Sequence, residues 1–169
     1  MRTGIEGRCD ILPIYEGTTT IQANDLLGRK TLRDGGTTAG RSAAMIAQTE
    51  QQLQQGSQVA REIAARLSGA REDFQSVVAY LVEVSPQDVN AAYAGAVPYL
   101  MLAGNLVAGW QLARSIIVAE AALARGEDGA FMSAKIATAR FYAHHILIAT
   151  ALQHVRITQG AASLLDAAL

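Results

Sequence analysis

The fold is decided by residues 57–84, SQVAREIAARLSGAREDFQSVVAYLVEV. Apolar side chains recur in this stretch at spacings of three and four residues, which is the period of one face of a helix. They are Val59, Ile63, Leu67, Ala70, Phe74, Val77 or Val78, and Leu81. The pattern predicts a helix that buries one side and leaves its charged side in solvent.

The segments before and after this stretch carry helical patterns bounded by glycine and proline. We expect helices from Thr18 or Thr19 to about Asp34, from Thr37 or Thr38 to about Gln54, from Pro86 to about Arg125 with Ser85 as N-cap, from about Ala130 to Gln159, and from Ala161 to Leu169. Pro98 should kink or split one of them near residues 94–97. Because the connecting turns are short, neighbouring helices should run antiparallel. The sequence therefore predicts an all-α fold, an up-and-down antiparallel helical bundle of four to five main helices.

The same periodicity predicts which side chains of the flanking helices lie on their apolar faces. They are Ile21, Leu26, Leu27 and Leu32 in the first, Ala44, Met45, Ala47 and Leu53 in the second, and Met132, Ile136, Ala139, Ala143, Ile146, Leu147 and Thr150 in the last long one. Trp110 is also expected in the core, where an aromatic ring fills the space that small residues leave.

No charged residue occurs between Asp88 and Arg114, and an uncharged stretch of this length raises the question of a membrane span. Asn105 and Pro98 lie within it, and the helices around it are amphipathic. We therefore expect a buried central helix and no membrane span. A membrane-associated protein built on residues 89–113 is the less favoured alternative.

Composition and charge limit the class of protein. Of the 169 residues, 50% are hydrophobic and only 5% are aromatic, which favours closely packed helices over sheet. The formal net charge is −1 and the basic residues are dispersed, so no nucleic-acid partner is expected. Cys9 is the sole cysteine and no signal-peptide pattern is present, so we expect a cytoplasmic protein without an internal disulfide.

One short motif, Tyr15-Glu16-Gly17-Thr18-Thr19-Thr20-Ile21-Gln22, carries a chemistry. Glu16 is a lone carboxylate beside a glycine that lets a ligand approach the backbone closely. The threonines supply a capping hydroxyl at a helix N-terminus, where unpaired N–H groups favour anions such as phosphate. A carboxylate in a partly apolar pocket can take a proton from a weak carbon acid near neutral pH. On residue types alone, the motif is more simply an ordinary loop and N-cap.

Nearly the whole chain, however, resembles the C-terminal part of those acyl-CoA dehydrogenases that carry an extra helical domain. The matching segments are Ile14-Tyr15-Glu16-Gly17-Thr18, Ile21-Gln22, Gly28-Arg29-Lys30, Arg33-Asp34-Gly35-Gly36, Ala96-Val97-Pro98-Tyr99-Leu100, Gly109-Trp110-Gln111-Leu112-Ala113-Arg114, Lys135, Ala139-Arg140-Phe141-Tyr142-Ala143 and Gly160-Ala161-Ala162. The resemblance implies that residues 1–36 hold an N-terminal loop and the final dehydrogenase-type helix. It implies that residues 37–169 form the appended C-terminal helical domain.

For the intact enzyme, the resemblance implies the α,β-dehydrogenation of acyl-CoA thioesters in fatty acid β-oxidation. Glu16 would be the catalytic base that removes the α-proton while a hydride passes from the β-carbon to FAD, and an electron-transfer flavoprotein would then take the electrons. Gly17 matches a position beside the substrate, and Thr18 and Thr20 match positions that contact FAD. Some relatives have an amide or glycine at position 20, so this chain departs from them there. Because the chain holds no counterpart of the family's N-terminal helical and middle β-domains, we expect it to bind no FAD and to be inactive alone.

The leading interpretation is a C-terminal dehydrogenase fragment whose helical domain covers a neighbouring subunit or the substrate cleft, and which forms a homo-oligomer. The alternative is a stand-alone helical interaction or regulatory protein that binds a dehydrogenase partner.

His144 and His145 suggest a metal site, but adjacent residues on a helix point in different directions and neither has a ligand partner at i+4. We therefore expect ordinary helix histidines and no metal site.

Overall fold

The computed structural model describes residues 17–166, and every regular element in that range is helical. The elements are α2 (Thr19–Asp25), the π-helix η1 (Leu26–Thr31), the 3₁₀ turn η2 (Leu32–Asp34), α3 (Thr37–Leu53), α4 (Gln58–Val84), α5 (Val89–Ala94), α6 (Ala96–Ala124), α7 (Gly129–His145), α8 (Ala149–Gln159) and α9 (Ala161–Leu165). The all-α prediction is confirmed.

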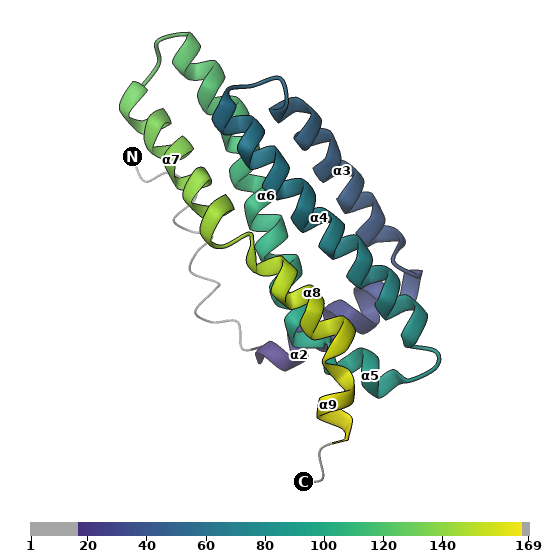
Figure 1. Cartoon of the computed structure of the whole chain (residues 1–169). Helices are drawn as coiled ribbons and strands as arrows, with labels where there is room; N and C mark the ends of the chain where they lie inside the picture. The colour runs from purple at the N-terminus through teal and green to yellow at the C-terminus, as the bar shows by residue number, and fades with distance from the viewer. Residues whose placement is uncertain (1–16, 167–169) are drawn as a thin grey trace.

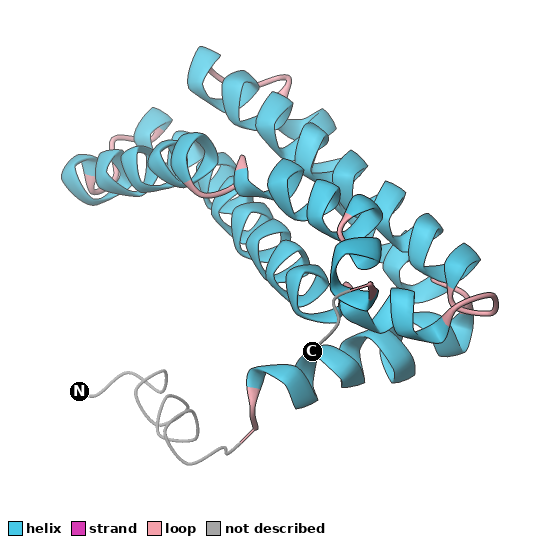
Figure 2. Ribbon diagram, turned by 60° about the horizontal axis from the view of Figure 1, so that its bottom comes forward, coloured by secondary structure: helices cyan, strands magenta, loops and turns pink. Residues whose placement is uncertain are grey.

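Four long stretches, α3, α4, α6 and the consecutive pair α7 and α8, lie side by side and alternate in direction (Figure 1). The central element is α6, which contacts α3, α4, α7 and α8. Figure 2 shows the same bundle from another side, with short loops joining its helices. The shorter helices α2, α5 and α9 gather with the start of α6 at one end, which we call the motif end because α2, whose N-cap is Thr18 of the motif, lies there.

The stretch that predicted the fold forms α4, the longest amphipathic helix of the bundle. Ile63, Leu67, Phe74 and Leu81 are buried in the hydrophobic core, as their spacing predicts, and Val59 is half-buried at its edge. The helix begins where the Ser57 hydroxyl oxygen accepts a hydrogen bond from the Ala60 N–H at 3.2 Å.

The predicted start of the next helix at Pro86 is wrong. Ser85 ends α4 instead, with its N–H bonded to the Leu81 carbonyl, and α5 begins only at Val89. Its N-cap is Asp88, whose Oδ1 accepts from the Ala91 N–H at 3.0 Å. The expected split near residues 94–97 falls at Gly95. Pro98 therefore lies in the first turn of α6, where a missing N–H breaks no helical hydrogen bond.

The single helix expected over residues 130–159 is also wrong, because it is interrupted between His145 and Ala149. The Leu147 N–H bonds to the Tyr142 carbonyl, five residues back, at 2.9 Å. This wide turn directs the Leu147 side chain onto α6 at Gly109, where an added Cβ would lie 2.9 Å from Leu147 Cδ1. Ile146 is consequently exposed rather than buried, whereas Leu147 is buried as predicted.

Of the four residues predicted on the buried face of α3, only Leu53 is buried. Ala44 and Met45 are exposed and Ala47 is only half-buried. The buried residues of the helix are Ala39, Ala43, Ile46, Thr49, Glu50 and Leu53. The spacing of apolar residues did not identify this face because two of its buried residues, Thr49 and Glu50, are polar.

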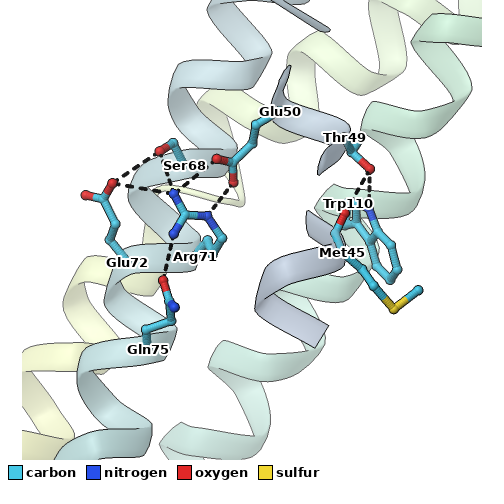
Figure 3. Close-up of polar contacts among 8 residues, drawn as sticks. All are labelled: Met45, Thr49, Glu50, Ser68, Arg71, Glu72, Gln75 and Trp110. Atoms are coloured by element: carbon cyan, nitrogen blue, oxygen red, sulfur yellow. Dashed lines mark hydrogen bonds and ion pairs between the residues drawn. The ribbon is translucent and has the colours of Figure 1, made fainter. Parts of the chain in front are cut away.

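Both polar residues are buried with partners (Figure 3). Arg71 of α4 donates from Nε to Glu50 Oε1 at 2.8 Å and from Nη2 to Glu50 Oε2 at 3.1 Å, a two-pronged pair between α3 and α4. The indole Nε1 of Trp110 donates to Thr49 Oγ1 at 2.8 Å, which joins α3 to α6. Trp110 itself is half-buried and packs against the core. These bonds fix the register of three helices.

Among the described helices, α6 alone is long and apolar enough to cross a membrane by length and composition. Core helices of soluble proteins satisfy the same criterion, and the inner face of α6 is buried in the bundle through Tyr99, Leu102, Leu106 and Ile116. Its outer face is solvent-exposed and carries Val97, Met101, Val107 and Val118. The prediction of a central helix is confirmed, but only one of its sides is buried.

Candidate functional site

The described part of the motif forms the start of α2. Thr18 has an extended backbone and its Oγ1 accepts a hydrogen bond from the Ile21 N–H at 3.3 Å, so it is the N-cap. Gly17, Thr18 and Thr20 are all exposed. The predicted base Glu16 lies outside the described residues. Three of the four predicted site residues are thus adjacent at one solvent-facing helix start.

The segment that follows the motif is anchored in the core of the bundle. Ala23 and Leu27 are fully buried in the same apolar cluster as α4 and α6. Gly28 lies against α5, since a Cβ there would be 2.5 Å from Tyr93 Oη and the tyrosine would have to move. The described part of the motif, residues 17–22, is therefore held at a defined place relative to α5 and α6.

The π-helix adds a buried polar contact to this anchoring. Thr31 is buried, and its hydroxyl donates to the Leu26 carbonyl at 3.0 Å. The same oxygen lies 2.9 Å from Tyr99 Oη on α6. Because the threonine has one hydroxyl proton and gives it to Leu26, Tyr99 must be the donor to Thr31. Burial raises the pKa of the Tyr99 hydroxyl, which keeps it protonated for that role.

The connection from this segment to α3 is a tight turn through two glycines. Gly35 and Gly36 have φ values of 61° and 79°, which lie in the left-handed region. Asp34 receives hydrogen bonds at Oδ2 from the Thr38 N–H at 3.0 Å and the Thr38 hydroxyl at 2.6 Å. These two donors lower the pKa of the Asp34 carboxyl.

The motif end also carries much of the exposed apolar surface. Its large exposed apolar side chains are Ile21 on α2, Val89 and Tyr93 on α5, Val97 and Met101 on α6, and Leu164 and Leu165 on α9. These seven side chains belong to helices at one end of the bundle, and exposed apolar residues that lie near one another are typical of interaction surfaces. This concentration includes α2, which carries the motif.

The two adjacent histidines lie away from the motif, on a cleft of about 440 Å³ along α7. His144 Nε2 faces Glu62 Oε2 of α4 at 3.9 Å, and Arg140 pairs with the same carboxylate at 3.2 Å. His145 instead stacks on Phe141, with the ring centroids 4.5 Å apart. The two rings thus have different partners, and residues 17–166 contain no group of three or more potential metal ligands.

Comparison with known proteins identifies the protein family to which the chain belongs. The family described as acetyl-CoA dehydrogenase C-terminal like matches residues 42–168, and the chain belongs to this family. Its sequence corresponds to the C-terminal part of acyl-CoA dehydrogenases, so the predicted resemblance is confirmed.

Two relatives show how much of such an enzyme the chain represents. It is 56% identical over 159 residues to 3-methylmercaptopropionyl-CoA dehydrogenase of Ruegeria pomeroyi, covering 94% of this chain and 27% of that protein. It is 36% identical over 143 residues to the broad-specificity linear acyl-CoA dehydrogenase FadE5 of Mycobacterium tuberculosis, covering 79% of this chain and 23% of that protein. The chain therefore spans about a quarter of the length of these relatives.

Sequence reasoning missed the residues that anchor the motif. Tyr93 was not singled out, and Tyr99 was named only within a matching segment and without a role. Nothing in the spacing of apolar residues indicates the π-helix that brings Thr31 to Tyr99. A signal was present in Gly28, a glycine inside a helical pattern, because such a residue often marks a close approach of another group.

Proposed function

We propose that this chain supplies the catalytic base and an appended helical domain to a flavin-dependent acyl-CoA dehydrogenase. The observation that carries the proposal is the position of the motif in a chain of this family. Its residues 18–22 form the capped start of α2, and the turns that follow are buried against α5 and α6. Proton abstraction requires a base in a fixed position, and the helix that follows Glu16 in the sequence is anchored in the bundle.

In the proposed reaction, Glu16 accepts the α-proton of an acyl-CoA thioester, and Gly17 leaves room for the substrate beside it. Thr18 and Thr20 contact FAD, which when bound supplies the acceptor for the β-hydride. The described residues fit such a contact. The Thr18 hydroxyl oxygen accepts from Ile21 and its proton can still be donated outward, and the Thr20 side chain is exposed.

The chain matches about a quarter of the length of each relative. The remaining walls of the pocket therefore come from the other three quarters of such an enzyme. The chain by itself therefore binds no FAD and has no activity. The exposed apolar side chains of the motif end, such as Ile21 and Met101, are placed to contact that missing part. In the assembled enzyme we propose a cytoplasmic homo-oligomer that acts in fatty acid β-oxidation and passes electrons to an electron-transfer flavoprotein.

The same exposed surface supports a second candidate function, a stand-alone helical protein that binds a dehydrogenase partner. Both candidate functions use the exposed apolar side chains of the motif end to contact a dehydrogenase. They differ in whether Glu16 acts as a catalytic base. A test of Glu16 therefore separates them.

The experiment is a chimera of the Ruegeria pomeroyi relative in which the matched C-terminal segment is replaced by this chain. It is assayed with 3-methylmercaptopropionyl-CoA, the substrate in that relative's name. We expect turnover, and we expect Glu16→Gln to lower kcat by about 10²- to 10⁴-fold with the FAD content unchanged. Glu83→Gln, which changes an exposed carboxylate at the end of α4, is the matched control and should leave kcat unchanged. A flavin-loaded chimera whose Glu16→Gln variant keeps its turnover would refute the catalytic role and favour the second candidate.

A further inference from the structure

A small apolar cavity of about 170 Å³ opens beside the anchored segment, between η1, α3 and α6. Its inner wall is made by Ile46, Phe74, Tyr99 and Leu106, all buried. Its mouth is formed by the exposed residues Lys30, Thr38 and Val107. The cavity therefore runs from the protein surface into the core, unlike the broad cleft along α7.

The size and lining of the cavity define the body of a ligand that would fit it. An apolar cavity of about 150 Å³, lined by leucine, isoleucine and phenylalanine, stays dry and binds benzene in another protein. A cavity of about 170 Å³ with a similar lining suits an apolar group of about six carbon atoms. The two hydroxyl groups in its wall are already hydrogen-bonded within the protein, because Tyr99 donates to Thr31 and Thr31 donates to Leu26. Neither hydroxyl has a proton left to donate to a ligand.

The polar groups at the mouth define the head of the ligand. The Thr38 hydroxyl is committed to Asp34 at 2.6 Å, and the Ser42 hydroxyl donates to the Thr38 carbonyl at 3.1 Å. Arg29, next to Lys30, is paired with Asp25 at 2.6 Å. Lys30 has no ion pair with any residue in the described part of the chain. The uncommitted group at the mouth is thus one ammonium, which favours one anionic oxygen group on the ligand.

The wall of the cavity is also the least regular part of the helical framework. It includes residues of the π-helix η1, a geometry found often at functional sites. A regular α-helix would place Leu26 and Thr31 differently with respect to α6, so the cavity depends on this turn.

We propose that the cavity binds a small amphiphilic monocarboxylate of about six carbon atoms. The apolar body lies against Phe74 and Leu106, and the carboxylate pairs with Lys30. The proposal is independent of the acyl-CoA reaction, because it concerns a ligand held by the helical domain alone.

The experiment is a titration of the isotopically labelled, purified chain with sodium hexanoate, followed through the NMR signals of its methyl groups. We expect saturable shifts confined to methyl groups that line the cavity, including those of Ile46, Ala103 and Leu106, with a Kd of about 1 mM. Hexan-1-ol and hexylamine, which carry a neutral and a cationic head, should bind more weakly in that order.

Two variants and their matched controls test the two halves of the site. Lys30→Gln should weaken hexanoate binding by up to about fivefold, as expected for an exposed ion pair, and leave hexanol binding unchanged. Lys135→Gln, which changes an ammonium on α7 that lies over Phe131, should have no effect. Ala103→Leu should fill the cavity and weaken binding at least about tenfold, whereas the exposed Ala44→Leu should not.

Thermal unfolding of each variant shows whether it is folded, and Lys30→Gln provides a test even if Ala103→Leu does not fold. The proposal is overturned if hexanoate gives no saturable shifts at tens of millimolar. It is equally overturned if hexylamine or hexanol binds as tightly as hexanoate, or if a folded Ala103→Leu variant binds as the parent does.

Discussion

Replacing Leu27 with alanine tests whether the segment that follows the motif is part of the folded bundle. Leu27 is fully buried, in the same cluster as the α4 and α6 side chains, although it lies in the π-helix and not in a long helix of the bundle. Truncation of a buried leucine to alanine costs about 3 to 5 kcal/mol of unfolding free energy, because the lost burial is compounded by the cavity left behind. The total free energy of unfolding of a domain of this kind is about 5 to 15 kcal/mol.

The assay is urea unfolding of the purified chain, followed by far-ultraviolet circular dichroism. With a denaturant dependence of about 2 kcal/mol per molar urea, Leu27→Ala should lower the midpoint by roughly 1.5 to 2.5 M. Leu67→Ala is the control, since Leu67 is equally buried but lies in the middle of α4. The two variants should shift the whole transition by similar amounts. A Leu27→Ala midpoint within about 0.3 M of the parent, with Leu67→Ala strongly shifted, would refute the view that the segment and the bundle fold as one unit.

Two further predictions concern the turn between this segment and α3. Gly36→Ala should destabilise the chain by about 1 to 3 kcal/mol, because its φ is left-handed and the new Cβ would lie 2.7 Å from Val78 Cγ1. Gly40→Ala, on α3 with open space around it, should instead stabilise the chain by about 0.5 to 1 kcal/mol; equal effects in thermal unfolding would contradict the geometry of the turn. Asp34 has a lowered pKa in the folded chain, so its charge stabilises the fold above its ordinary pKa of 3.8, and this contribution is lost as the pH falls through the folded-state value. The stability difference between the parent and Asp34→Asn should therefore be present at neutral pH and disappear in acid, and a difference that does not change with pH would be the contrary result.

Most of the fold could be predicted from sequence because the longest amphipathic helix, α4, has an uninterrupted period. In α4 each core position is apolar, so Ile63, Leu67 and Phe74 identify the buried side directly. The pattern failed in α3 because Thr49 and Glu50 are buried with partners on other helices. Their partners, Trp110 and Arg71, come from other parts of the chain, and local periodicity contains no information about them.

Interruptions of helices were harder to predict than the helices themselves. The break after His145 places Leu147 against Gly109, and this contact joins residues that no local signal connects. The π-helix likewise depends on a contact between distant residues, since Thr31 and Tyr99 are 68 residues apart in the sequence. In both places a distant contact overrides the local preference for a continuous α-helix.

The candidate site was predicted in part. The capping role of the motif threonines follows from residue type, and Thr18 has it. The roles of Glu16, Gly17, Thr18 and Thr20 in chemistry, and the division of the chain at residues 36 and 37, stay predictions. The anchoring of the motif by Tyr93 and Tyr99 could not be predicted, because it depends on how α5 and α6 pack against η1.

We propose that the chain supplies a catalytic base to a pocket whose other walls belong to the rest of a dehydrogenase. The most direct measurement is the visible absorption spectrum of the purified chain after incubation with FAD and desalting, together with its turnover of acyl-CoA thioesters. We expect a colourless protein with no turnover, although the chain is folded by circular dichroism. A flavin spectrum that survives desalting, or measurable dehydrogenation by the chain alone, would contradict it.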